Sequence, residues 1–154
     1  MLGTCPFCKS DGIGKTDEEI AEELMKRAET NDAGAMYALA NLYDHGHDGL
    51  LQEDRAKALE LWKQATELGS SMAHYNLGVY YYEGGHLKKA KFHYEAAAMA
   101  GQEVARCNLG TIKEASGHVE QAIKHWTIAL SAGNHAAMHA LRTNVENGFV
   151  KSLQ

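Results

Sequence analysis

Apolar and polar residues along this chain follow a helical pattern that repeats every 32 residues. Glycines end successive segments at Gly69, Gly101 and Gly133. A bulky aromatic residue stands seven positions before each glycine, and small residues flank it at helical spacing. The aromatic residues are Trp62, Tyr94 and Trp126, and the small residues are Ala58, Ala65, Ala90, Ala97, Ala122 and Ala129. Self-similarity at a fixed period of this length is typical of a helical solenoid.

The pattern predicts an all-α chain of eight helices with no sheet. Thr16 and Glu19 form a capping box at the start of the first helix. Ser70 or Ser71 and Asn134 suit later N-caps, and Asn147-Gly148 is expected to end the last helix. The expected ranges are 17–31, 33–45, 54–68, 71–83, 87–100, 103–116, 119–132 and 135–146.

Each pair of helices has a small residue at one position of its first helix. The series is Leu39-Ala40, Leu77-Gly78 and Leu109-Gly110. Glycine inside a helix costs about 0.5–1 kcal/mol relative to alanine. We therefore expect the second helix of each pair to approach closely at Gly78 and Gly110, with the aromatic residue as the main core anchor.

At these positions the chain resembles the Sel1-like repeat family, a relative of the tetratricopeptide repeat. One matching segment is A-x-x-N-L-G-x-x-Y, which begins at Ala73, and the other is ALELWKQATELG, which begins at Ala58. The resemblance covers about residues 33–145. It implies a curved α-solenoid of antiparallel helix pairs that acts as a protein–protein adaptor or scaffold without catalysis of its own.

The same repeats predict how the chain is divided. Residues 1–15 are expected to be a flexible N-terminal segment, and residues 16–154 a single helical-repeat domain. Within this domain we expect a capping helix, three repeats and a C-terminal capping helix. Their ranges are 16–32 for the first cap, 33–69, 70–101 and 102–133 for the repeats, and 134–147 for the last cap.

Composition narrows the class of function. Apolar residues make up 45% of the 154 residues, which is enough for a packed core. The net charge of −5 and the lack of an evident basic face argue against nucleic acid as a partner. No apolar stretch approaches the ~20 residues that span a bilayer. Three cysteines do not make a disulfide framework. We therefore expect a cytoplasmic, or alternatively nuclear, monomer that does not bind membranes.

Cys5 and Cys8 form the only C-x-x-C motif, which is half of a zinc site because tetrahedral zinc needs four ligands. The motif resembles the closing cysteine pair of a RING-type zinc finger whose other ligands would lie upstream of Met1. This resemblance supports an alternative function, a fragment of a RING-type ubiquitin ligase whose solenoid selects the substrate. Without upstream ligands we expect no zinc and no other cofactor.

Nine histidines and one further cysteine are candidates for metal binding or catalysis. His45 and His47 lie together in one turn, and His135 and His139 share a helix face, but neither cluster has a third ligand nearby in the sequence. Both are expected to be solvated surface histidines. Cys107 lies within a predicted helix, where a buried structural thiol is the expected state. Since the sequence also lacks the common catalytic motifs, we expect no enzymatic activity.

The resemblance also predicts a binding surface, because the first helix of each pair would line the concave face. The positions two before, two after and five after the central leucine would then turn toward the groove. These positions hold Tyr37, Asn41, Asp44, Tyr75, Val79, Tyr82, Cys107, Thr111 and Glu114. Tyrosines offer large contact area, and Asn41 can form two hydrogen bonds to an extended backbone. The partner would be a peptide or a helix of another protein. The alternative is that the tyrosines merely pack between helices.

Overall fold

The computed structural model describes residues 16–46 and 51–152, and within these ranges all regular elements are helices. The predicted all-α class is confirmed. The helices are α1 (Asp17–Glu29), α2 (Ala33–His45), α3 (Arg55–Glu67), α4 (Ser71–Glu83), α5 (Leu87–Met99), α6 (Glu103–Ala115), α7 (Val119–Ser131) and α8 (His135–Ser152). The first seven are each thirteen residues long and begin within one residue of the expected positions.

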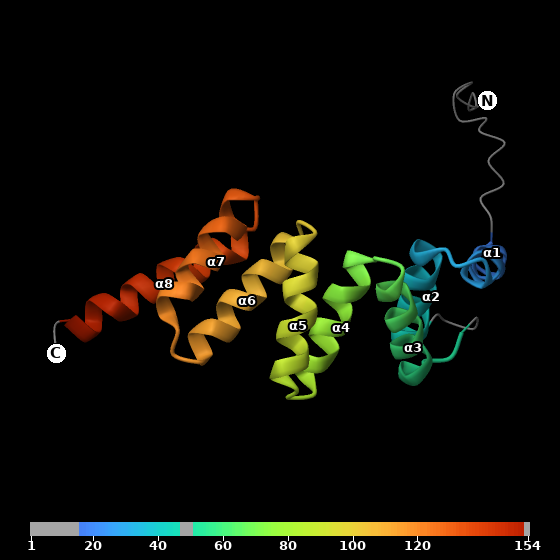
Figure 1. The fold of residues 1–154 in the computed structure, drawn as a ribbon, viewed down its shortest axis with the longest axis horizontal. Coiled ribbons are helices and arrows are strands. Elements are labelled where there is room, and N and C mark those ends of the chain that lie inside the picture. The colour runs from blue at the N-terminus through green and yellow to red at the C-terminus, as the bar shows by residue number, and fades with distance from the viewer. Residues whose placement is uncertain (1–15, 47–50, 153–154) are drawn as a thin grey trace, which may run out of the picture.

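The helices form three pairs, α2/α3, α4/α5 and α6/α7, which follow one another along the long axis of the molecule (Figure 1). Helix α1 lies at one end of this stack and α8 at the other. We call α2, α4 and α6 the A helices, and α3, α5 and α7 the B helices. This arrangement confirms the predicted helical solenoid.

Caps fix the ends of these helices. Thr16 and Glu19 form the predicted capping box, with each side chain bonded to the other residue's backbone N–H. The Ser70 hydroxyl accepts from the N–H of Ala73 at 3.2 Å and thereby starts α4. Asp32, Asp54 and Asn134 cap α2, α3 and α8 in the same way. The predicted glycine ends are confirmed as well, because Gly69, Gly101 and Gly133 have φ between 86° and 96°.

The core consists of the aromatic and small residues that recur every 32 positions. Trp62, Tyr94 and Trp126 are only 3%, 2% and 1% exposed. The six alanines that flank them on the B helices are all fully buried. A Cβ added to Gly78 would lie 2.5 Å from Cδ1 of the Tyr94 ring, and one on Gly110 would collide with the Trp126 indole. The close approach predicted from the two glycines is therefore confirmed.

The predicted end of the last helix at Asn147-Gly148 is wrong, because α8 continues to Ser152. Gly148 is not among the glycines with positive φ, and nothing lies within 4 Å of the place where its Cβ would be. A single glycine costs a helix only about 1 kcal/mol, so it ends the helix only where a left-handed turn follows. Here the chain simply continues as a helix.

Helix α1 carries the spacing of a B helix. Its buried Ala21 and Ala28 correspond to Ala58 and Ala65 of α3, and the half-buried Met25 stands where the B helices have their aromatic residue. Leu24 and Met25 pack against the core of the first pair. Helix α1 thus covers the end of that core as a B helix of a preceding repeat would.

Candidate functional site

Two hollows lie between successive A helices, and we call the exposed sides of α2, α4 and α6 the helix-A face. The first hollow, of about 300 Å³, lies between α2 and α4 and has Trp62 of α3 among its lining residues. It is lined by Asp44, His45, Arg55, Trp62, Tyr75, Asn76, Val79, Tyr80 and Glu83. The second, of about 90 Å³, lies between α4 and α6 and is lined by Tyr82, Tyr94, Asn108 and Thr111.

The two hollows occupy equivalent places in successive repeats. Each has the aromatic residue of a B helix among its lining residues and an asparagine in the wall of the following A helix. Four pairs of lining residues correspond by position, namely Asp44 with Tyr82, Trp62 with Tyr94, Asn76 with Asn108, and Val79 with Thr111. The helix-A face therefore offers the same kind of depression twice, with different side chains in each.

Asn41 is held in place beside the first hollow. Its Oδ1 accepts from Nε1 of Trp62 at 3.1 Å and from Nδ2 of Asn76 at 2.7 Å. These two bonds join α2 to both α3 and α4 and use both lone pairs of the oxygen. The side-chain oxygen that a bidentate contact with a peptide backbone needs is thus already occupied, and only the amide NH₂ group of Asn41 remains for a partner.

The first hollow also holds an ion-pair chain that crosses from one repeat to the next. Arg55 Nε donates to Oδ1 of Asp44 at 3.2 Å, and its Nη2 lies 3.9 Å from Oε2 of Glu83. The hydrogen bond and the charge of Asp44, together with the charge of Glu83, raise the pKa of the Arg55 guanidinium. Asp44 belongs to the first pair and Glu83 to the second, so Arg55 connects the two helix pairs.

The structure brings most of the predicted partner-binding residues together at these two hollows. Asp44, Tyr75 and Val79 line the first, and Tyr82 and Thr111 line the second. Tyr37 lines neither hollow and packs instead against the core of the first pair.

Sequence reasoning missed Asn76, Asn108, Tyr80 and Glu83. The recurrence of asparagine at 32 residues was the signal that could have identified Asn76 and Asn108.

Cys107 does not belong to this surface. The thiol is 7% exposed and packs with Ala122, Trp126 and Ala137 in the core of the third pair. Burial raises its pKa. The predicted buried structural thiol is confirmed, and the suggestion that Cys107 faces the groove is wrong. The reason is that α8 packs against α7 and covers the end of that core.

Within the second pair, two histidines contact each other. Nδ1 of His74 on α4 lies 3.0 Å from Nδ1 of His93 on α5, so one ring donates and the other accepts. Tyr81 stacks on the His93 ring with centroids 5.5 Å apart, and Phe92 meets both imidazoles edge-on. Burial lowers the pKa of both rings, to about 4 in His93, where His74 adds to the effect.

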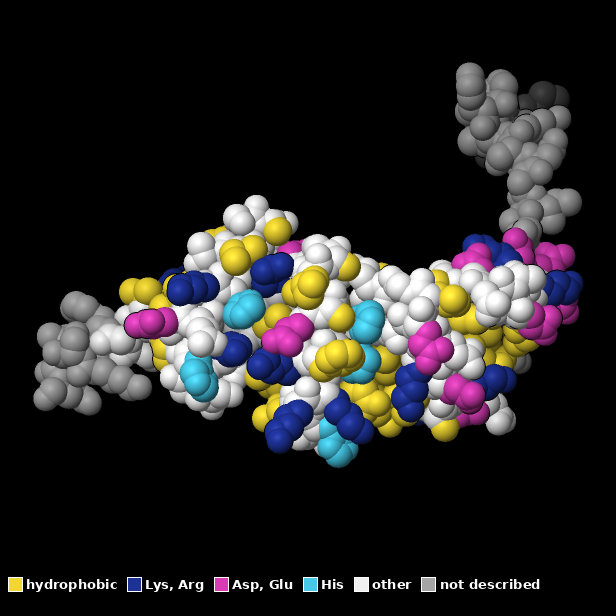
Figure 2. Space-filling view, in the orientation of Figure 1, with side chains coloured by type: hydrophobic (Ala, Val, Ile, Leu, Met, Phe, Trp, Pro, Cys, Tyr) yellow, Lys and Arg dark blue, Asp and Glu magenta, His cyan; other side chains and the backbone are white. Residues whose placement is uncertain are grey.

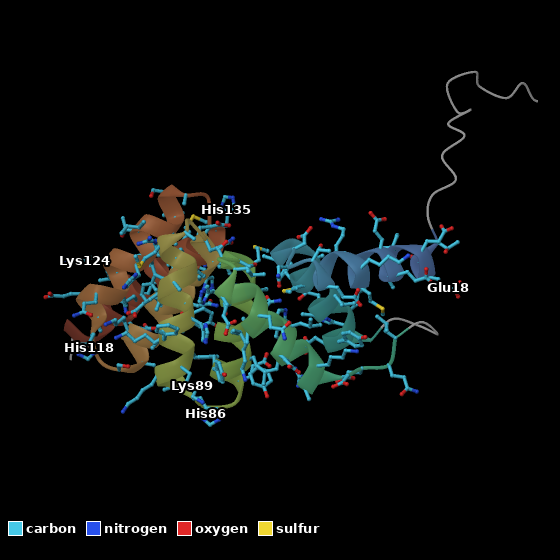
Figure 3. All side chains as sticks on the ribbon, turned by 45° about the vertical axis from the view of Figure 1, so that its right-hand side comes forward. Glu18, His86, Lys89, His118, Lys124 and His135 are labelled. Carbon is cyan, nitrogen blue, oxygen red and sulfur yellow. The ribbon has the colours of Figure 1, made fainter. Side chains whose placement is uncertain are left out.

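Most of the other described histidines are exposed, and His47 lies outside the described residues. His45, His135 and His139 are exposed, as expected. His86 and His118 lie at separate turns, at the starts of α5 and α7 (Figure 3). Within the described ranges no three potential metal ligands cluster, and Cys5 and Cys8 lie outside them. None of the described helices is both long enough and apolar enough to cross a bilayer.

This architecture of stacked antiparallel helix pairs defines a helical-repeat solenoid, and the sequence assigns it to a family. The Sel1 repeat model matches residues 1–32, 33–70 and 71–102. The chain therefore belongs to the Sel1 repeat family. The first match includes Cys5 and Cys8 together with α1, and α6 and α7 continue the same register beyond the last match. No curated protein matches the chain.

Solved structures share the same fold. A protective antigen present in uropathogenic Escherichia coli strains, c5321, is 30% identical with a TM-score of 0.71 over 82% of this chain. The chain spans 29% of the length of that antigen. A Sel1 repeat protein from Oxalobacter formigenes is 28% identical with a TM-score of 0.68, and 79% of this chain aligns with 96% of it. MamA is 26% identical with a TM-score of 0.56, and the match covers 73% of this chain and 66% of MamA. The Sel1-repeat fold is consistent with a protein-interaction scaffold, and proteins of this family are generally non-catalytic.

Proposed function

We propose that this chain is a non-catalytic adaptor that binds another protein on the helix-A face. The bound element is an extended peptide or a helix that crosses α2, α4 and α6. The observation that carries the proposal is the pair of equivalent hollows, because they place exposed or half-buried side chains over a rigid core at regular spacing. A rigid surface of this kind loses little conformational entropy on binding.

The tyrosines are the anchors of this interaction. Tyr82 is 43% exposed at the second hollow, and Tyr75 is half-buried at the first. Tyr75 also packs 6.1 Å from the Tyr94 ring, so its orientation is fixed before a partner arrives. Pre-positioned aromatic side chains are frequent hot spots in protein interfaces. The chain would act as a monomer in a reducing compartment such as the cytoplasm.

A pull-down with the Tyr75→Ala/Tyr82→Ala variant tests the proposal. We expect this variant to lose the proteins that the unchanged chain captures from a lysate. Circular dichroism and a melting curve must first show that it is folded. The matched control is Phe92→Ala, which removes an aromatic side chain that is 63% exposed on the B side of the second pair. Loss of binding in Phe92→Ala alone would move the site to the B helices.

The alternative function, a RING-type ligase fragment, depends on Cys5 and Cys8. The Sel1 match to residues 1–32 includes both cysteines, and this favours the adaptor over the ligase.

A further inference from the structure

The two hollows of the helix-A face differ in charge. Asp44, Glu83 and Arg55 all line the first hollow, whereas the second is lined by two tyrosines, an asparagine and a threonine. At corresponding positions, Asp44 of the first hollow is replaced by Tyr82 in the second. A partner that crosses both therefore meets an acidic rim in one repeat and an uncharged one in the next.

The first hollow already stabilises one cation, the guanidinium of Arg55, with the carboxylates of Asp44 and Glu83. Its guanidinium is bonded to Asp44 but reaches Glu83 only at 3.9 Å, and the side chains of Arg55 and Glu83 are 57% and 61% exposed. The second carboxylate is thus only loosely engaged. The rings of Tyr75 and Tyr80 line the same space, and aromatic faces attract Arg and Lys side chains. This hollow therefore has the groups that recognise a second cation.

The charge of the surrounding residues also favours a cation at the first hollow. Residues 16–83 contain fourteen Asp and Glu but five Lys and Arg, whereas residues 84–154 contain five acidic and eight basic residues. Acidic side chains accordingly gather toward the α1 end of the face drawn in Figure 2, while lysine, arginine and histidine are more frequent over α5 to α7. The first hollow lies in the acidic half, which attracts a basic segment at long range.

Resting on the proposed function, we infer that the partner is an extended basic segment that places an Arg or Lys in the first hollow and a small apolar residue in the second. Neighbouring repeats are separated by a distance on the order of 10 Å, the spacing of packed helices. An extended chain in the polyproline II conformation advances about 3.1 Å per residue and brings every third side chain to the same side, so the two anchors are three residues apart. The volume of about 90 Å³ in the second hollow suits a side chain such as Ala or Val.

Phage display of random dodecapeptides on the full chain tests this inference. We expect enriched peptides to carry Arg or Lys three positions from Ala or Val. Synthetic fluorescent copies of those peptides should bind about threefold to fivefold more weakly to Glu83→Gln, as for a partly exposed ion pair. Their affinity should also fall between 50 and 500 mM NaCl. Glu60→Gln is the matched control, because Glu60 is exposed on α3 and lines neither hollow.

The outcomes separate this inference from the proposed function. One outcome would overturn the inference but leave the helix-A face as the site. In it, the selected peptides fail to bind Tyr75→Ala/Tyr82→Ala, but they are not enriched in Arg or Lys and bind Glu83→Gln as tightly as the unchanged chain. Peptides that bind the tyrosine variant as well as the unchanged chain would overturn both. So would a selection in which no sequence is enriched.

Discussion

The first and third helix pairs carry a tryptophan at the same position, yet the two indoles donate to different partners. Trp62 Nε1 bonds to the Asn41 side chain at 3.1 Å, and Trp126 Nε1 bonds to the backbone oxygen of Cys107 at 3.2 Å. The facing residue of the A helix is Ala40 in the first pair and Gly110 in the third. A Cβ at Gly110 would lie 2.5 Å from Cδ1 of the indole, so the methyl group of Ala40 excludes that ring position.

The small residue on the A helix and the partner of the tryptophan therefore differ together between these two pairs. In the third pair the ring lies over the A helix and ties it through the backbone. In the first pair the indole reaches the helix-A face and orients Asn41, which in turn bonds to Asn76. The recurring small and aromatic residues determine how the helices pair. A departure from this pattern, such as Ala40 in place of the glycine of the other pairs, accompanies a different set of polar groups at the surface.

The largest effect is expected from removing the tryptophan itself. Trp126→Ala should lower the free energy of unfolding by about 3–5 kcal/mol, as truncation of a fully buried aromatic residue does. Trp62→Ala should cost a similar amount. Urea denaturation followed by circular dichroism measures both, with exposed Lys124→Ala as the control. A loss below about 1 kcal/mol would show that the indole is not the core anchor.

Exchanging the small residues tests the difference between the pairs directly. Gly110→Ala should lower stability by about 1–3 kcal/mol because the added methyl meets the indole. Ala40→Gly should cost about 1 kcal/mol through helix propensity. Gly148→Ala is the matched control: the same substitution, in open space, should stabilise α8 by about 0.5 kcal/mol. A stabilising Gly110→Ala would contradict the close approach.

These pairs show which parts of the structure the sequence can predict. The 32-residue period located the helices, the caps and the buried aromatic residues, because burial on one side of a helix leaves a periodic record. The bonds of Asn41 left no such record. They depend on side-chain rotamers and on how neighbouring helices are positioned along their axes. The spacing of residue types in the sequence predicts neither.

For the candidate site, the sequence likewise predicted lining residues but not the contacts between them. The positions relative to the central leucines indicated Asp44, Tyr75, Val79, Tyr82 and Thr111, which line the hollows. The ion-pair chain through Arg55 was not foreseen, because the corresponding positions of the other pairs hold Leu87 and Val119, so no repeated residue type pointed to it. Likewise, the 3.0 Å contact of His74 and His93 joins residues 19 positions apart on different helices.

A smaller effect is expected from removing the acceptor of Trp62. Asn41→Ala should cost about 1–2 kcal/mol, because the buried indole N–H loses its partner and Asn76 loses its bond to α2. Thr111→Ala changes the corresponding, exposed position of the third pair and should alter stability by less than about 0.5 kcal/mol. Equal losses in the two variants, measured by urea denaturation, would show that the Asn41 bonds do not stabilise the fold.

The smallest effect concerns pH and compares the first and second pairs. His74 and His93 stand where the first pair has Met36 and Leu61. The pKa of His93 is about 4 in the fold against 6.5 in the unfolded chain. As the pH falls from 6.5 toward 4, the unfolded chain binds the proton first, so the free energy of unfolding decreases. Below about 4 both states are protonated and the loss is complete.

The His74→Met/His93→Leu variant gives the second pair the residues of the first. We expect it to lose about 1 kcal/mol less stability than the unchanged chain between pH 7 and pH 5, an amount that allows for the partial exposure of the rings. Urea denaturation at both pH values measures the difference. His135→Gln, which removes an exposed histidine, should follow the unchanged chain. If the double variant and the unchanged chain lose equal amounts of stability, the contact between His74 and His93 does not resist protonation.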